Sequence, residues 1–329
     1  MKLKIVSALL LLCCFAFLAI TSGAIPVMTE AEAVGADVEQ PPAPDPTNVP
    51  VPEPEPTTAP ERVADAEQPE TPSPEAEPPV HVETTTITGD SILDDHTYYD
   101  AVPDELMDDA FRLPLPADGY QILIIHTHAT EAYMPTEEEP YDQDEDCRTT
   151  DPEHSVIRVG EELAQALSAY GLNVLHDTQL HDYPSYNGSY ARSGETVEAF
   201  LADHPEIGIV IDLHRDALED GDTVYRTDAG IDSVEAAQLM FVMGSDVNLE
   251  HPGWRENLKL ALTLQKTVSE RWPTLMRPVV LCDYRYNQQL TPGSLLLEVG
   301  TSGNTLEEAL AAVDLFAEAV GPLLASWTE

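Results

Sequence analysis

Residues 121–131 read QILIIHTHATE, and this short stretch indicates both a fold class and the place of a site. Its first part, Gln121–Ile125, is a continuous apolar run, as expected of a strand buried on both faces of a parallel sheet. His126, His128 and Glu131 follow directly, and all three side chains are of types that bind metals. Because sites in parallel sheets collect at the carboxyl ends of strands, we expect a site where this strand ends.

Similar apolar runs alternate with helical patterns along the rest of the chain. Strands are expected at 172–175, 207–213, 239–243, 279–282 and 294–299, and helices at 156–170, 193–203, 254–272 and 306–320. Pro322 is expected to break the last helix. This alternation predicts an α/β fold, a three-layer sandwich with a mostly parallel central sheet, spanning residues 119–329.

The N-terminal third has a different composition. Lys2 and Lys4 precede an apolar run over residues 5–28, the pattern of an export signal. We favour a retained single-pass membrane anchor because the run is long enough to span a bilayer. Cleavage, which would give a secreted protein, and lipid attachment at Cys13 or Cys14 are the alternatives. Each of them puts the rest of the chain outside the cytoplasm.

Residues 29–90 are rich in Pro and Glu and poor in large apolar side chains, which predicts a disordered linker. Residues 91–118 form a lead-in segment with a few apolar residues and a short helix candidate. The formal net charge of −45 disfavours nucleic acid as a partner, because phosphates would be repelled. A Cys147–Cys282 bridge and two free thiols are equally open alternatives.

Two further apolar runs are followed by ionisable residues. His214 follows the run at 207–213, and Glu298 follows SLLL at 294–297. His128 and Glu131 are spaced so that both can reach one ion, and His214 would supply a third ligand. Two histidines, one glutamate and a water form a common open catalytic Zn²⁺ site. Glu298, a carboxylate expected to be buried, is the candidate general base.

Several neighbours of this site have more than one interpretation. His126 is an alternative ligand, a substrate contact or a group supporting a ligand. Asp212 or Asp216 would orient a metal-binding imidazole. Arg215 would stabilise an oxyanion or bind a peptide carboxylate, or else serve as the counter-ion of one of these aspartates.

A tyrosine-rich loop and a second polar segment are candidates for substrate binding. The loop at 183–192 reads YPSYNGSYAR, and an aromatic wall ending in an arginine suits a sugar–peptide substrate. A purely structural, tyrosine-packed loop is the alternative. The candidate substrate contacts are Tyr186, Arg192, Tyr284 and Arg285.

Five collinear stretches of the predicted domain resemble the stage II sporulation protein P family of cell-wall hydrolases. They are ILIIHTHATEAYMP (122–135), RTTD with VIRVGEEL (148–163), HDYPSYNGSYARSGETV (181–197), VIDLHRDA (210–217) and YRYNQQLTPGSLLLEVGTSGNTLEEAL (284–310). The resemblance implies a catalytic fold similar to zinc-dependent amidases and zinc carboxypeptidases. It places the metal on His128, Glu131 and His214 and the catalytic role on Glu298. The acidic segment 136–147, with its cysteine, departs from the family pattern.

The resemblance also implies a function. The expected reaction is hydrolysis of the amide between N-acetylmuramic acid and L-alanine in peptidoglycan, together with cleavage of peptide cross-links. The expected setting is septal wall thinning during engulfment in sporulation, with the stage II sporulation proteins D and M as partners. Two other hypotheses are a zinc carboxypeptidase or endopeptidase of wall peptides and a non-catalytic wall-binding assembly protein.

Overall fold

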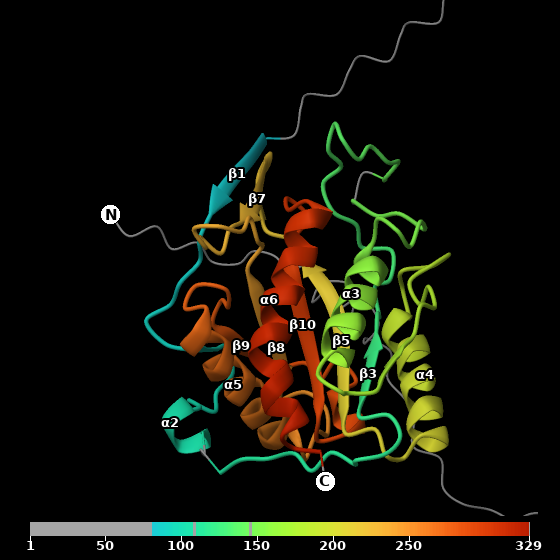
Figure 1. The fold of residues 1–329 in the computed structure, drawn as a ribbon, viewed down its shortest axis with the longest axis vertical. Helices are drawn as coiled ribbons and strands as arrows, with labels where there is room; N and C mark the ends of the chain where they lie inside the picture. The colour runs from blue at the N-terminus through green and yellow to red at the C-terminus, as the bar shows by residue number, and fades with distance from the viewer. Residues whose placement is uncertain (1–80, 108–109, 145–146, 329) are drawn as a thin grey trace, which may run out of the picture. The chain divides into compact units, whose positions relative to one another are not determined.

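The computed structural model describes residues 81–107, 110–144 and 147–328 (Figure 1). The expected membrane anchor at 1–28 and the expected linker up to residue 80 lie outside this part. No helix among residues 81–328 combines the length and apolar character needed to cross a bilayer.

A seven-stranded sheet forms the centre of the described chain, in the order β2-β9-β8-β10-β5-β3-β4. Its strands are β2 (Leu93–Asp95), β3 (Ile122–Ile125), β4 (Val174–His176), β5 (Ile209–Asp216), β8 (Leu239–Gly244), β9 (Val279–Cys282) and β10 (Ser294–Thr301). All neighbouring pairs are parallel except β8 with β10. The predicted α/β class and the mostly parallel sheet are confirmed.

Helices cover the two faces of this sheet unequally (Figure 1). The main core contains side chains of α3 (Val156–Ser168), α5 (Trp254–Arg271) and α6 (Leu306–Ala325), packed on one face. The opposite face receives α4 (Ser189–Asp203), which packs against β3 and β5. This gives the three predicted layers, but α4 covers only one side of its face.

Strand alternation decides which side chains face each layer. In β10, Leu295 and Leu297 enter the main core, whereas Leu296 belongs to a small apolar cluster on the opposite face. That cluster also contains Met240 and Val242 of β8, packed against Tyr286 from a loop. Because no helix packs on this cluster in the described chain, side chains of β5, β8 and β10 line an open cavity there.

Several element boundaries differ from the predicted ones. Strand β5 continues through Asp216, so His214 lies within the strand rather than beyond its end. Helix α4 begins at Ser189, four residues before the predicted start at 193. Helix α6 continues past Pro322 to Ala325, because Leu324 extends its apolar face into the core and is only 2% exposed.

A second, three-stranded sheet has no counterpart in the prediction. It contains β1 (His81–Thr85), β6 (Glu219–Asp220) and β7 (Thr223–Thr227), in the order β1-β7-β6. Strand β1 falls within the segment at 29–90 that was expected to be linker, and its parallel pairing with β7 explains why it is ordered. The lead-in at 91–118 packs on the domain through β2, α2 (Pro103–Leu106) and the buried Leu115.

One close backbone approach in the main sheet yields a stability test. A methyl group added at Gly244 would lie 2.0 Å from the carbonyl oxygen of Tyr284. We expect Gly244→Ala to lower the free energy of unfolding by about 1–3 kcal/mol, as overpacking does. Gly253→Ala is the matched control, since nothing lies within 4 Å of its added methyl group. Urea denaturation measures both, and equal midpoints for the two variants would contradict this packing.

Candidate metal centre and catalytic pocket

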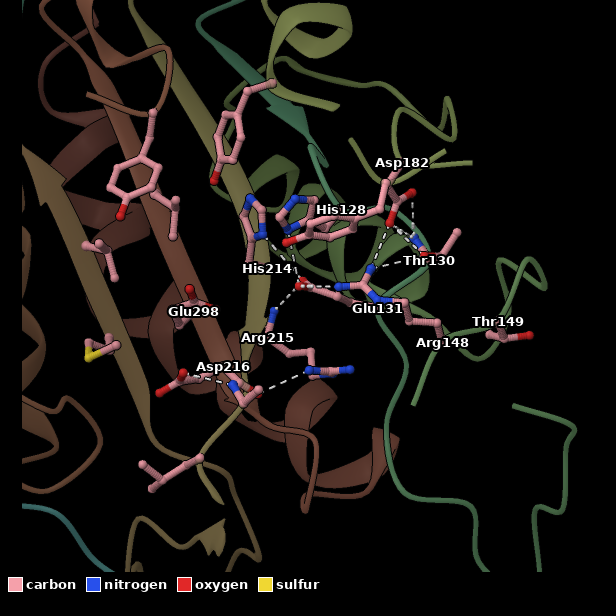
Figure 2. Close-up of a pocket in the computed structure, with 18 of the residues that line it drawn as sticks. His128, Thr130, Glu131, Arg148, Thr149, Asp182, His214, Arg215, Asp216 and Glu298 are labelled. Atoms are coloured by element: carbon pink, nitrogen blue, oxygen red, sulfur yellow. Dashed lines mark hydrogen bonds and ion pairs between the residues drawn. The ribbon is translucent and has the colours of Figure 1, made fainter. Parts of the chain in front are cut away.

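The three residues predicted to bind metal meet at one point. His128 and Glu131 lie in the loop after β3, and His214 lies on β5; one donor atom from each falls within 4.8 Å of the other two. His128 Nδ1 is 3.4 Å from Glu131 Oε1, and His214 Nδ1 is 3.3 Å from Glu131 Oε2. All three side chains are buried and point toward one another (Figure 2).

Hydrogen bonds to β5 hold the loop that carries two of these residues. Thr127 donates to Asp212 twice, from its main-chain N (2.8 Å) and from Oγ1 (2.6 Å). The main-chain N of Arg215 donates to Glu131 Oε2 at 3.1 Å. Since β3 and β5 are adjacent parallel strands, these bonds fix His128 and Glu131 relative to His214.

The electrostatics of the cluster suit a cation. His214 Nε2 lies 2.9 Å from Asp212 Oδ1, so the ring stands between two buried carboxylates. Burial alone favours the neutral imidazole, but Asp212 and Glu131 together raise the pKa of His214 well above its usual value. The carboxylates therefore stabilise a positive charge at this point. Two imidazoles and a carboxylate are also a donor set that zinc prefers, and the residues present fit such an ion.

Glu298 faces the same cavity from the neighbouring strand. On β10 it stands opposite His214 of β5, and it lines a cavity of about 750 Å³ together with the three metal-binding candidates (Figure 2). Within the described chain, its buried Oε2 has no hydrogen-bond partner. Burial raises the pKa of Glu298 to about 8. A carboxyl group with such a pKa can both accept and donate a proton near neutral pH.

His126 and Asp216, two predicted alternatives, have other partners. The Nδ1–H of the fully buried His126 donates to the carbonyl of Leu213 at 2.9 Å, and Nε2 lies 2.9 Å from His176 Nε2. With both ring nitrogens engaged, His126 is outside the cluster, and His128 is the histidine that belongs to it. Asp216 pairs with Arg277 at 2.7 Å, so Asp212 is the aspartate beside His214.

A comparison of sequences places the chain in a known family. The sequence profile of stage II sporulation protein P matches residues 26–321. The chain belongs to the stage II sporulation protein P family. The stage II sporulation protein P of Bacillus subtilis (strain 168) is 32% identical over 216 residues, which cover 61% of this chain and 51% of that relative. The chain thus spans about half the length of the curated relative it matches.

The solved structures that a structural comparison finds are distant from this chain in sequence. An N-acetylmuramoyl-L-alanine amidase of Clostridium difficile 630 is 14% identical, with a TM-score of 0.37 over 63% of this chain and 95% of that one. An N-acetylmuramoyl-L-alanine amidase of Nostoc punctiforme is also 14% identical, with a TM-score of 0.35 over 64% of this chain and 98% of that one.

Arg215 lines the same cavity as Glu298, but its guanidinium does not pair with Asp212 or Asp216, the predicted partners. Its Nε donates to the carbonyl of Ala132 at 2.7 Å, and Nη2 donates to the carbonyl of Cys147 at 2.9 Å. It is therefore not the counter-ion of Asp212 or Asp216. A catalytic role toward an oxyanion stays a prediction. Cys147 and Cys282 do not form a disulfide with each other, so the bridge alternative is wrong.

The candidate substrate contacts divide into two groups. Tyr186 lines the cavity and stacks on the His128 ring, with centroids 4.6 Å apart and planes at 28°. Arg192 instead donates to carbonyl oxygens of its own loop, at Ser185, His181 and Asn187. Tyr284 and Arg285 lie outside the cavity lining, where Tyr286 takes their expected place.

Arg148 is the main site residue that the sequence did not single out by its chemistry. Its Nη1 is 2.8 Å from Asp182 Oδ2, its Nη2 is 3.6 Å from Glu131 Oε1, and its Cζ lies 4.9 Å over the Tyr186 ring. Arg148 opens the RTTD stretch, which carried part of the family resemblance. That resemblance was the available signal, because local periodicity says nothing about where this loop folds back.

The buried His126 generates a prediction about acid stability. Burial is the largest of the effects that lower the pKa of His126 to about 3, so between pH 6.5 and 3 the unfolded chain binds a proton that the folded chain does not. The stability due to this residue is therefore complete above pH 6.5 and is lost as the pH falls. Urea denaturation at several pH values gives the free energy of unfolding as a function of pH. Below pH 6, His126→Asn should reduce the slope of this function by up to about 1.4 kcal/mol per pH unit.

The control for this prediction lies within the same experiment. Above pH 8 the imidazole is neutral in both states, so the difference in unfolding free energy between wild type and His126→Asn should stay constant there. Identical slopes for the two proteins between pH 6 and 4 would show that His126 is not held neutral by burial.

Proposed function

We propose that this protein is a zinc-dependent peptidoglycan hydrolase that cleaves the amide bond between N-acetylmuramic acid and L-alanine. The observation that carries the proposal is the meeting of His128, Glu131 and His214 within 4.8 Å, with Glu298 on the adjacent strand of the same cavity. Membership of the stage II sporulation protein P family supports the wall as substrate and sporulation as the setting.

In this proposal His128, Glu131 and His214, which line the cavity, would hold the zinc ion. When bound, the ion supplies a Lewis acid that polarises the scissile carbonyl and lowers the pKa of a water molecule. Asp212, 2.9 Å from His214 Nε2, keeps the Nδ1 atom of that ring turned toward Glu131. The main-chain N of Arg215 donates to Glu131 Oε2, the oxygen that also faces His214 Nδ1, and so helps to hold the carboxylate in place.

Glu298 carries the proton transfers. Its carboxylate takes a proton from water as the water oxygen attacks the lactyl carbonyl carbon of muramic acid. When the C–N bond breaks, Glu298 gives that proton to the departing amine of L-alanine. The products are the free lactyl carboxylate on the sugar and a peptide with a free amino terminus. Met240, Val242 and Leu296, the apolar neighbours of Glu298 in the cavity, favour the protonated form between the two transfers.

The proposal includes the cellular setting. Residues 1–28 would anchor the protein in the membrane, and the acidic, Pro-rich residues that follow would extend the catalytic domain into the septal wall. The stage II sporulation proteins D and M would be partners in wall thinning during engulfment. Cleavage of peptide cross-links at the same centre is a second activity of the proposal.

Substitution of Glu298 separates catalysis from metal binding. We expect Glu298→Gln to keep the zinc content of the wild type and to lower hydrolysis of purified sacculi about 10²–10⁴-fold, because Gln cannot accept the proton. Mass spectrometry of the products identifies the bond, since an amidase releases intact peptides and leaves peptide-free glycan. Glu318→Gln, a partly exposed position on α6 whose carboxylate pairs with Arg271 away from the cavity, is the matched control. Wild-type rates in the Glu298→Gln protein would refute its role.

Substitution of His214 tests the metal centre itself. We expect His214→Ala to lose bound zinc, measured by elemental analysis of the purified full chain, and to lose hydrolysis with it. His204→Ala, at the exposed end of α4, should bind as much zinc as the wild type. Chelation of the wild type should abolish hydrolysis, and added zinc should restore it. Full activity of the wild type in chelator would overturn the zinc requirement.

A further inference from the structure

A series of aromatic rings, each in contact with the next, begins at the metal centre. The series is Tyr186, His128, Tyr190, Tyr286 and Tyr284, here called the aromatic track. Successive ring centroids are 4.6, 5.5, 5.6 and 6.3 Å apart. These spacings place each ring in contact with the next. The inner end of the track is thus His128, which we assign to the metal, with Tyr186 stacked on it.

The track is assembled from separate segments of the chain. Tyr186 and Tyr190 come from the loop before α4 and its first turn, whereas Tyr284 and Tyr286 come from the loop after β9. Asn287 joins the two segments, because its side-chain amide donates to the carbonyl of Tyr190 at 2.8 Å. Tyr286 (φ 45°) and Asn287 (φ 57°) both adopt the left-handed conformation that favours glycine. The backbone is therefore held in an unfavourable turn that presents these two tyrosines.

The rings of the track remain accessible. Tyr186, Tyr190 and Tyr286 line the cavity, and Tyr186 and Tyr284 are 45% and 37% exposed. Aromatic side chains of this size normally bury their faces, so a series of accessible tyrosines beside a cavity indicates a ligand with flat apolar surfaces. The apolar face of a pyranose ring is such a surface.

Charge favours a sugar over a peptide along this track. The chain has a net charge of −45, and Asp144, Asp182 and Asp216 are among the residues that line the cavity. Two of the arginines that line the cavity are paired with these carboxylates, Arg148 with Asp182 and Arg277 with Asp216, and the third, Arg215, donates to main-chain carbonyl oxygens. A peptide rich in carboxylates would be repelled, whereas N-acetylated sugars stack without needing a counter-charge.

We propose that the aromatic track binds the glycan strand of peptidoglycan, with successive N-acetylated sugar rings stacked on Tyr190, Tyr286 and Tyr284, beyond the Tyr186 ring that already contacts His128 and Arg148. The muramic acid whose lactyl amide is cut lies at the His128 end, and the strand continues outward over Tyr286 to Tyr284. The reaction at the inner end rests on the proposed function, but glycan binding along the track does not require hydrolysis. The enzyme then selects its bond by holding the sugar side of the amide.

Binding of peptide-free peptidoglycan oligosaccharides of two and six sugars to the full zinc-loaded chain tests this proposal by calorimetry. The wild type should bind the hexasaccharide more tightly than the disaccharide. Tyr284→Leu should reduce that gain and leave disaccharide affinity unchanged, since Tyr284 forms the end of the track away from His128. Tyr286→Leu should weaken hexasaccharide binding about five- to tenfold, the size of one lost aromatic contact. Tyr286→Phe, which keeps the ring, should bind like the wild type.

Tyr98→Leu is the matched control, because Tyr98 is an exposed tyrosine outside the cavity. Its affinity for the hexasaccharide should equal that of the wild type, and all the variants should contain equal zinc. Wild-type hexasaccharide affinity in both Tyr284→Leu and Tyr286→Leu would overturn the proposal. The proposal would also be overturned if a sugar-free stem peptide bound more tightly than the hexasaccharide and if Tyr284→Leu and Tyr286→Leu weakened binding of that peptide. If oligosaccharides bind as expected but sacculi stay intact, the track stands and the proposed hydrolysis fails.

Discussion

The buried charge around His214 is the constraint on which the rest of the site depends. The carboxylates of Asp212 and Glu131 both lie within 3.3 Å of its ring, and all three groups are removed from water. An unpaired buried carboxylate is very costly, so the arrangement requires a positive charge between them and donors around them. Thr127 and the main chain of Arg215 supply such donors. The loop after β3 is therefore tied to β5 by the same contacts that prepare a place for a cation.

The uneven covering of the sheet explains why the site lies on a face rather than beyond an edge. Three helices fill one face, and α4 fills only the β3–β5 side of the other. On the open side, strand alternation presents His214 from β5 and Glu298 from β10 next to Met240 and Leu296. The predicted position at the carboxyl ends of the strands holds for the loop with His128. For His214 and Glu298 the strands simply continue, because β5 and β10 pair beyond the apolar runs.

The sequence predicted those features that depend on local periodicity and failed for those that depend on distant partners. Continuous apolar runs located the main strands, and polar residues after them located His128, His214 and Glu298. Strand β1 was missed because HVETT has no apolar pattern and is ordered by pairing with β7. Arg192 was expected at the substrate, but it donates to carbonyl oxygens of nearby residues and lies outside the lining of the cavity at the metal centre, whereas Arg148 reaches that cavity through the fold of its loop. Tertiary contacts decide which residues pair in these cases, and they produce no periodic pattern in the sequence.

Two paired residues of adjacent strands in the cavity have opposite electrostatic preferences: the surroundings of His214 favour a positive charge, and those of Glu298 disfavour a negative one. On one wall, carboxylates hold the pKa of His214 high and favour a cation; on the floor, burial among apolar side chains raises the pKa of Glu298 to about 8. Proton transfer at a cation site needs both, since the cation lowers the pKa of water while the base must still be able to hold the proton. Glu298 stands directly opposite His214 across β10 and β5. A slip of β10 by one residue would turn Glu298 into the helix-covered core and bring Val299 or Leu297 to the cavity. The pairing of these two strands thus fixes the chemistry as firmly as the identity of the residues does.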